Sequence, residues 1–298
     1  MPESHKVVPR VALRFDVDTY QCMHRGVPRL LELADEFQIP MTFFINMGRA
    51  VSYPGILRKL GNRRYPVETT AGVSAKISPV KKLGLRGTLY TLLANPRVGL
   101  SSQLFPEIQS RGHEIGLHGG RNHACWQNSA HTWAREHLNS ELAWGLRALK
   151  DAGVSAPRSF ASPGWNSPEA LPAVLPQKEF TVLADHHNPE HNARLCSQSN
   201  DTIRFINTNL AGEPGGVGYL ESCEARGLTF RDTNTDVRQA LQRFADVVMY
   251  DHPAYAGGRG LARLQAIITA LKQRNVQFLT LTEMAWGDLR ERQFKQSV

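Results

Sequence analysis

Four short clusters of acids and histidines carry the groups that this chain could use for metal chemistry. They are Asp16 with Asp18, His118 with His123, Asp185 alone, and Asp251 with His252. Two histidines and one carboxylate are a common ligand set for a catalytic divalent ion, because they leave one coordination position open for water. A second acid and a third histidine then remain for proton transfer, so the set predicts metal-assisted hydrolysis. Taken singly, each residue could instead be a polar group that satisfies the local backbone at a strand end.

These clusters need a fold that brings strand ends together. Each follows a short apolar run typical of a strand, and strand and helix patterns alternate along most of the chain. The expected strands are 11–15, 41–45, 113–117, 159–161, 181–184, 203–206, 247–250 and 276–281; the expected helices are 27–37, 132–152, 236–245 and 261–274. This alternation predicts an α/β fold, a single distorted (β/α) barrel of about seven parallel strands over residues 1–298. In such a fold the carboxyl ends of the strands collect the site.

The spacing of the first cluster supports a shared site. Positions i and i+2 of an extended chain point to the same side, so Asp16 and Asp18 can both reach one ion. One carboxylate can bind the ion while the other takes a proton from water.

The net charge of +8 and pI near 9.5 arise largely from an insertion at about 53–100. Its only acid is Glu68, and it carries nine basic residues: Arg58, Lys59, Arg63, Arg64, Lys76, Lys81, Lys82, Arg86 and Arg97. Apolar runs lie among them, a composition that favours peripheral contact with an anionic membrane surface or a lipid phosphate. The alternative is an ordinary insertion whose apolar residues pack on the barrel. No helix has the basic stripe that nucleic-acid binding uses, so we expect no nucleic acid, and no partner protein is predicted.

The chain has no run of eighteen apolar residues and no apolar centre in residues 1–10, so we expect a cytoplasmic protein, peripheral at the inner face of the membrane. Its four cysteines form no Cys-x-x-Cys pair, which favours reduced, structural thiols. Cys125, close to the histidine pair, is an alternative metal ligand.

In these clusters the chain resembles the polysaccharide deacetylase family, the group with a NodB homology domain. The family's first motif ends a strand in Asp-Asp or Asp-x-Asp, which implies Asp16 as general base and Asp18 as metal ligand. Its second motif, His-[Ser/Thr]-x-x-His, implies His118 and His123 as the other ligands, with zinc the expected divalent ion. Here one extra residue separates the histidines, so His123 needs a bulge or a loop to reach the ion.

The third motif resembles Phe-Ala-Ser-Pro-Gly-Trp at 160–165. The resemblance implies that the backbone N–H near Trp165 forms half of an oxyanion hole, with the metal as the other half. The arginine that holds the base in the family is replaced by Ala161. Three other arginines could hold Asp16 in its place, namely Arg14, Arg121 and Arg158.

The last two motifs imply two further roles. Asp185 is expected to tune the catalytic histidine, and His252 is expected to be the general acid that protonates the leaving amine. Asp251, on the other side of the strand, is expected to be structural. A second metal site over 185–191 is disfavoured, since Pro189 interrupts any helix there.

Within the family, the sequence segments 15–19, 25–31, 114–118 and 123–127 most resemble those of deformylases whose amino-sugar substrate is carried by polyprenyl phosphate. The expected function is therefore removal of an N-formyl or N-acetyl group from an amino sugar linked to such a carrier. Two alternatives remain within catalysis, a deacetylase of soluble or polymeric sugars and a cyclic amide hydrolase. A catalytically silent sugar- or lipid-carrier-binding protein is favoured by the stretched histidine pair and the absent arginine.

Overall fold

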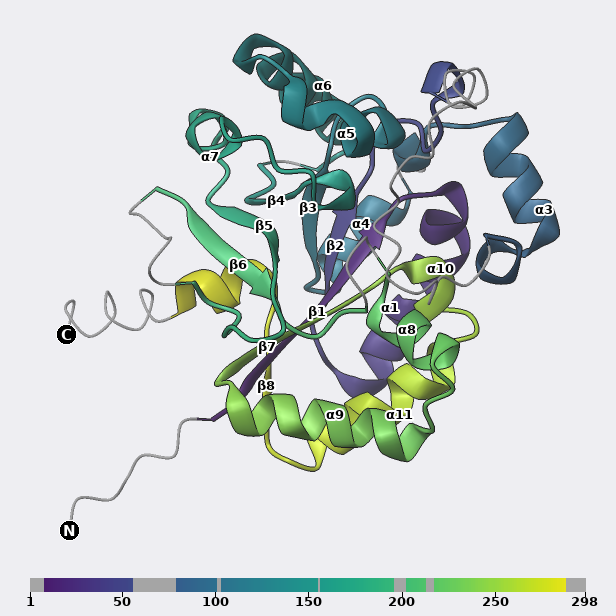
Figure 1. The fold of residues 1–298 in the computed structure, drawn as a ribbon, viewed down its shortest axis with the longest axis vertical. Helices are drawn as coiled ribbons and strands as arrows, with labels where there is room; N and C mark the ends of the chain where they lie inside the picture. Colours follow the sequence, from purple (N-terminus) through teal and green to yellow (C-terminus); the bar gives the residue numbers. More distant parts are fainter. Residues whose placement is uncertain are drawn as a thin grey trace, which may run out of the picture.

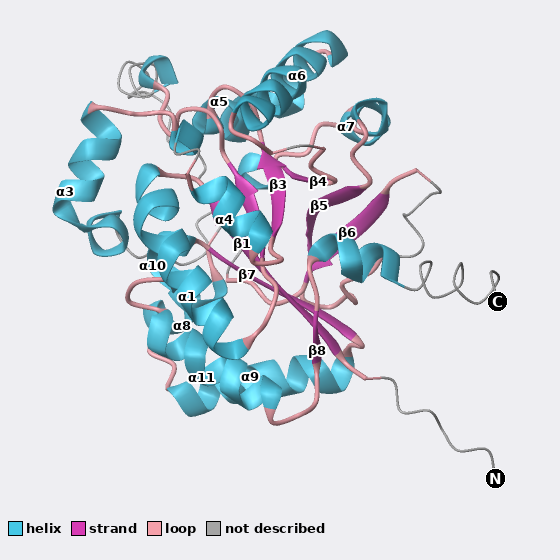
Figure 2. Cartoon of the chain, turned by 180° about the vertical axis from the view of Figure 1, so that it is seen from behind, coloured by secondary structure: helices cyan, strands magenta, loops and turns pink. Residues whose placement is uncertain are grey.

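Parallel strands form a nearly closed barrel with helices around its outside (Figures 1 and 2). The computed structural model describes residues 8–55, 79–100, 103–154, 156–195, 202–212 and 217–287. The strands are β1 (Arg10–Val17), β2 (Thr42–Ile45), β3 (Glu114–His118), β4 (Ser159–Ala161), β5 (Val182–His187), β6 (Arg204–Thr208), β7 (Asp246–Asp251) and β8 (Gln277–Phe278). Their order is β6-β5-β4-β3-β2-β1-β7, with β8 paired to β1. The two ends approach where Leu210 bridges Met249, which confirms the expected barrel.

Helices cover the barrel in the intervals between the strands. In the described ranges they include η1 (Cys22–Gly26), α1 (Val27–Phe37), α3 (Pro79–Leu93), η2 (Val98–Leu100), α4 (Leu104–Ser110), α5 (His123–Ser129), η3 (Ala130–Thr132), α6 (Arg135–Asp151), η4 (Pro163–Trp165), α7 (Leu171–Val174), η5 (Pro176–Lys178), α8 (Tyr219–Ala225), α9 (Phe230–Arg243), α10 (Pro253–Ala256) and α11 (Leu261–Lys272). Among the residues that the structure describes, no helix is both long and apolar enough to cross a bilayer.

Most expected elements lie within a few residues of their observed bounds, and the largest difference is the start of α9. This helix begins at Phe230 instead of 236 because Thr229 and Asp232 form a capping box. The Thr229 hydroxyl accepts the N–H of Asp232, while the Asp232 carboxylate accepts the N–H of Thr229. The last strand, expected over 276–281, pairs only at Gln277 and Phe278.

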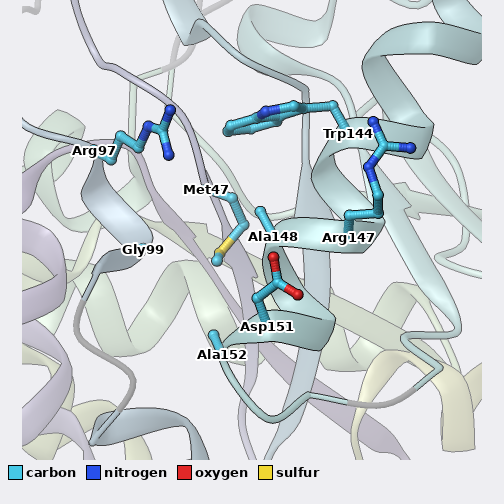
Figure 3. Close-up of a pocket in the computed structure, with 8 residues that line it drawn as sticks. All are labelled: Met47, Arg97, Gly99, Trp144, Arg147, Ala148, Asp151 and Ala152. Carbon is cyan, nitrogen blue, oxygen red and sulfur yellow. The ribbon is translucent and has the colours of Figure 1, made fainter.

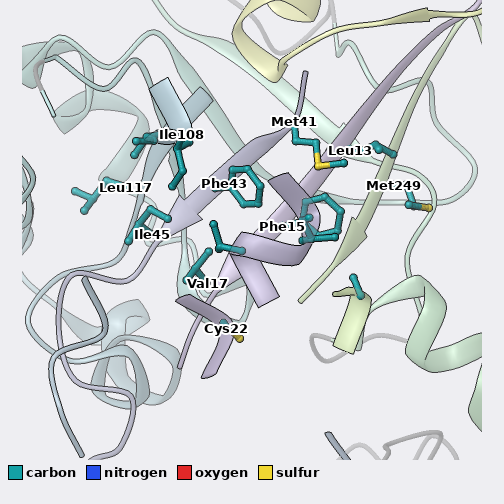
Figure 4. Close-up of a cluster of buried hydrophobic side chains, with 14 of the residues drawn as sticks. Leu13, Phe15, Val17, Cys22, Met41, Phe43, Ile45, Ile108, Leu117 and Met249 are labelled. Carbon is teal, nitrogen blue, oxygen red and sulfur yellow. The ribbon is translucent and has the colours of Figure 1, made fainter. Parts of the chain in front are cut away.

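The strands separate two sets of side chains. Leu13, Phe15 and Val17 of β1 point outward into the main core, where the Phe15 and Phe43 rings stack at 5.7 Å (Figure 4). Burial of each such side chain contributes roughly 1.5–3 kcal/mol. The alternate residues of β1 belong to the barrel interior, where the neighbouring side chains include small ones such as Ala161. This alternation carries Asp16 into the barrel.

The basic insertion is described only in part. Residues 56–78 lie outside the described residues, and with them Arg58, Lys59, Arg63, Arg64 and Lys76. The described remainder includes α3, which is kinked at Gly84 (φ 73°). Thr91 of α3 donates a hydrogen bond of 2.8 Å to Gln21, and the Tyr90 and Tyr20 rings meet edge to face. The helix therefore flanks the short helical segment that follows Asp18.

Candidate metal centre

Asp18, His118 and His123 meet at the carboxyl ends of β1 and β3. Asp18 Oδ1 lies 3.2 Å from Nε2 of each histidine, and the three candidate ligand atoms are within 4.8 Å of one another. Asp18 Oδ1 and His123 Nε2 are buried, and despite these short distances neither atom makes a well-directed hydrogen bond within the described ranges. Buried polar atoms without a partner are rare because desolvation is costly. Two imidazole nitrogens and a carboxylate oxygen that converge in this way fit a divalent ion such as zinc.

The His118 ring is oriented by the backbone of β4. Its Nδ1 lies 2.9 Å from the carbonyl oxygen of Ala161. Since a carbonyl only accepts, Nδ1 carries the proton and Nε2 presents its lone pair to the ligand cluster.

His123 reaches the cluster although one extra residue separates it from His118. The intervening loop turns at Gly119, whose φ of 75° suits glycine, and the N–H of Arg121 donates to the buried carboxylate of Glu141 at 2.7 Å. Asn122, which stands at the family spacing, caps the N-terminus of α5 with its side chain. The loop that the spacing requires is thus present, and it delivers His123 as the first residue of α5.

Asp16 lies beside the cluster and is held by Arg14. Arg14 Nε donates to Asp16 Oδ1 at 3.0 Å and Nη2 donates to Oδ2 at 2.9 Å, a bidentate pair. Arg14 is fully buried, and Asp16 Oδ2 is 3.8 Å from His118 Nε2. Among the three candidate arginines, Arg14 is the one that orients Asp16, since Arg121 pairs with Glu141 and Arg158 is exposed.

His252 approaches the same acid from the end of β7. Its Nε2 is 3.1 Å from Asp18 Oδ2 and 3.0 Å from the hydroxyl of Tyr250, while its Nδ1 is 3.2 Å from Glu221 Oε1. Asp251 accepts backbone N–H groups instead, which agrees with the structural role expected for it. Hydrogen bonds therefore account for the group formed by Glu221, Asp251 and His252 without a second ion.

Asp185 is hydrogen-bonded to the backbone of the third motif. Its Oδ1 accepts the N–H of Ser162 at 2.6 Å, and burial raises the pKa of this carboxyl. The acid that lies at His252 Nδ1 is Glu221, whereas the resemblance implies that Asp185 tunes this histidine.

Trp165 contributes its ring to the site. Its backbone N–H donates to the carbonyl oxygen of Ser162 at 3.1 Å, and the oxyanion donor expected near Trp165 stays a prediction. The indole lies over the Arg14 guanidinium at 4.3 Å and meets the Tyr250 ring at 5.3 Å. Trp165 and Tyr250 thus form an aromatic wall beside Arg14.

Electrostatic coupling within the cluster is strong. Burial alone would raise the pKa of Asp18, but positive charge on His123 and His252 and contact with His118 hold it well below its ordinary value. Burial would lower the pKa of His118, yet Asp16 and Asp18 raise it. The site therefore favours negative charge on the acid and positive charge beside it, the distribution that a bound cation would exploit.

Three other candidate features are not part of the cluster of Asp18, His118 and His123. The thiol of Cys125 contacts Ser52 at 3.3 Å. Neither group of potential metal ligands found among the described residues includes His186, His187 or His191. A cavity of about 370 Å³ lies between α6 and the η2 segment, where Trp144, Arg97 and Asp151 line it (Figure 3). None of the predicted site residues lines that cavity.

Two contacts of His252 were not foreseen from the sequence. Glu221 lies on the short helix α8, inside a segment rich in glycine and asparagine, and no strand-end rule points to it. Tyr250 could have been found, because it stands two residues before His252 on β7 and so faces the same side.

The family model for polysaccharide deacetylases matches residues 4–183, which include Asp16, Asp18 and both histidines of the second motif. The chain belongs to the polysaccharide deacetylase family. The description of the matched family, polysaccharide deacetylase, names enzymes that hydrolyse a carbon–nitrogen bond, which is the enzyme class expected from the sequence.

Two curated proteins with the same name are similar to part of this chain. A probable 4-deoxy-4-formamido-L-arabinose-phosphoundecaprenol deformylase from Shewanella sediminis is 32% identical over 186 residues, which are 59% of this chain and 55% of that protein. The protein of the same name from Wigglesworthia glossinidia brevipalpis is 27% identical over 159 residues, 50% of each chain. The chain thus matches about half the length of these relatives.

Solved structures share the fold at low sequence identity. A Mycobacterium smegmatis protein described as a polysaccharide deacetylase superposes with a TM-score of 0.58 at 18% identity, covering 97% of this chain and 93% of that one. PuuE allantoinase superposes with a TM-score of 0.57 at 12% identity, covering 93% and 89%.

Proposed function

We propose that this chain is a metal-dependent hydrolase that removes a formyl or acetyl group from an amino sugar carried by a polyprenyl phosphate. The observation that carries the proposal is the convergence of Asp18, His118 and His123, with Asp16 on one side and His252 on the other. The names of the two curated relatives support the formyl group and the lipid carrier.

The roles of the chain's own residues follow from their positions. When bound by Asp18, His118 and His123, a divalent ion supplies positive charge that activates water and polarises the acyl oxygen. Asp16 takes the proton of the attacking water, and Arg14 fixes the direction in which its two oxygens point. His252 gives a proton to the departing nitrogen through Nε2, the ring nitrogen that faces the cluster.

The substrate assay compares carriers and acyl groups. The zinc-loaded chain is incubated with formamido-arabinose phosphoundecaprenol, with its N-acetyl counterpart and with water-soluble acetylated oligosaccharides, and released formate or acetate is measured. Release from the lipid-linked sugar alone supports the full proposal. Release only from soluble sugars would replace it with a polysaccharide deacetylase, and release from none would favour a silent binding protein.

A lipid-linked substrate requires access from a membrane, and α3 offers a suitable surface. Leu85, Leu89 and Leu93 recur at helical spacing, and their exposed fractions are 63%, 46% and 77%. The exposed Arg86 lies among them. Since the opposite side of α3 contacts Gln21 beside the site, a membrane under this apolar stripe would present its lipid near Asp18.

We expect the double variant Leu89→Ser with Leu93→Ser to bind vesicles that contain anionic phospholipid about tenfold more weakly, because two exposed apolar groups are lost. Co-sedimentation at low and high salt measures it, and part of the binding should be lost at high salt. Phe230→Ser removes an exposed apolar group from α9 and serves as the control. Equal binding by the parent and the double variant would count against membrane contact through α3.

A further inference from the structure

The imidazole of His252 has a polar partner at each ring nitrogen. Glu221 Oε1 lies 3.2 Å from Nδ1, while Nε2 lies 3.0 Å from the Tyr250 hydroxyl and 3.1 Å from Asp18 Oδ2. The residues His252, Glu221 and Tyr250 are buried, with exposed fractions of 4% or less. A buried carboxylate is costly unless strong donors satisfy it, so the ring N–H is part of what makes this position of Glu221 favourable.

The backbone around Glu221 is fastened to the strand that carries His252. Asp251 accepts the N–H of His252 with one oxygen and the N–H of Leu220 with the other, both at 2.7 Å. Gly218 permits this close approach, because a Cβ there would lie 2.4 Å from the Asp251 carboxyl carbon. The start of α8 is thus tied to the end of β7, which places Glu221 against Nδ1.

We propose that Glu221 and Tyr250 are positioning residues for His252, one at each ring nitrogen. The role of His252 itself rests on the proposed function. Glu221 accepts a hydrogen bond from Nδ1–H and so turns Nε2 towards the reacting nitrogen, the role that the family resemblance gives to Asp185. The Tyr250 hydroxyl can accept from Nε2–H or donate to a bare Nε2, so it holds the ring in either state. When the leaving nitrogen of the substrate binds at Nε2, the Tyr250 hydroxyl gives up its hydrogen bond to Nε2 and becomes available to the substrate.

Steady-state kinetics of the zinc-loaded full chain test the two residues separately. Glu221→Gln keeps the shape of the side chain and Tyr250→Phe keeps the ring. Each is expected to lower kcat on the order of 10²-fold, because a proton donor displaced by about 1 Å loses that much rate. KM and zinc content should stay within about twofold of the parent, which a general loss of structure would not allow.

Matched controls exist in the same region. Glu224 lies three residues further along α8, and it accepts a hydrogen bond from Tyr255. Glu224→Gln and Tyr255→Phe remove the same chemical groups without touching His252, and both should retain the kcat of the parent. Parent-like kcat in Glu221→Gln and Tyr250→Phe would overturn the proposal.

The ¹⁵N NMR signals of the His252 ring, assigned by comparison with His252→Gln, give a readout that does not depend on turnover. We expect a proton on Nδ1 in the parent and a displaced Nδ1 signal in Glu221→Gln. A parent protein whose His252 Nδ1 carries no proton would overturn the role of Glu221. A protonated Nδ1 in a parent that releases neither formate nor acetate would support the role of Glu221 and overturn the proposed function instead.

Discussion

Replacing Asp18 with asparagine is expected to remove bound metal and activity together. Asp18 Oδ1 is the atom that both histidine Nε2 atoms approach at 3.2 Å, and Asp18 is the one acid of the triad. An amide has no negative charge and is a poorer ligand for zinc. Mutation of a residue that only hydrogen-bonds a metal ligand lowers metal affinity by roughly 10- to 100-fold, and loss of the ligand itself should lower zinc affinity by more. Metal content after dialysis and the rate of formate release measure the two effects.

The matched control is Asp151→Asn, which makes the same chemical change at an exposed position of α6. It should keep both zinc and activity. An Asp18→Asn protein that holds a full equivalent of zinc at parent affinity would contradict the assignment of Asp18 as a ligand.

Asp16→Asn is expected to separate chemistry from metal binding. Asp16 is bonded by Arg14 at both oxygens and is 3.8 Å from His118, close to the cluster but outside the ligand triad. An asparagine cannot accept the proton of the attacking water, so kcat should fall about 10²- to 10⁴-fold while zinc stays bound. Kinetics and metal analysis on one preparation measure both quantities.

The variant Arg14→Lys weakens the support of Asp16 without removing its carboxylate, and its kcat is compared with that of Asp16→Asn. Lysine keeps the positive charge but loses the fork that contacts both Asp16 oxygens, so we expect an intermediate kcat at unchanged zinc content. Circular dichroism establishes that the variant folds, since Arg14 is fully buried. Loss of zinc from Asp16→Asn would show that Asp16 is a ligand and would refute its role as the base.

The sequence could predict those parts of the site that obey strand geometry. Asp16 and Asp18 share one side because Asp18, the residue after β1, stands two positions from Asp16. His118 and His252 follow apolar runs whose ends meet in a parallel barrel. Polar groups at strand ends therefore predict that Asp16, Asp18, His118 and His252 form one cluster.

Contacts made from helices and loops could not be predicted in the same way. Glu221 reaches His252 from α8, whose position depends on Asp251 and on the space left by Gly218. Arg14 differs from these contacts, because it stands two residues before Asp16 on β1, and the same alternation could have singled it out among the three candidate arginines. The early start of α9 depended on the Thr229 cap, a side-chain hydrogen bond that hydrophobic periodicity does not report.

The most direct test of metal-dependent deformylation is a titration of the metal-free chain with zinc while formate release from formamido-arabinose phosphoundecaprenol is followed. The site formed by Asp18, His118 and His123 predicts that the rate rises with bound zinc and saturates at about one equivalent per chain. Full activity in the metal-free protein, or no release at any zinc loading, would contradict it.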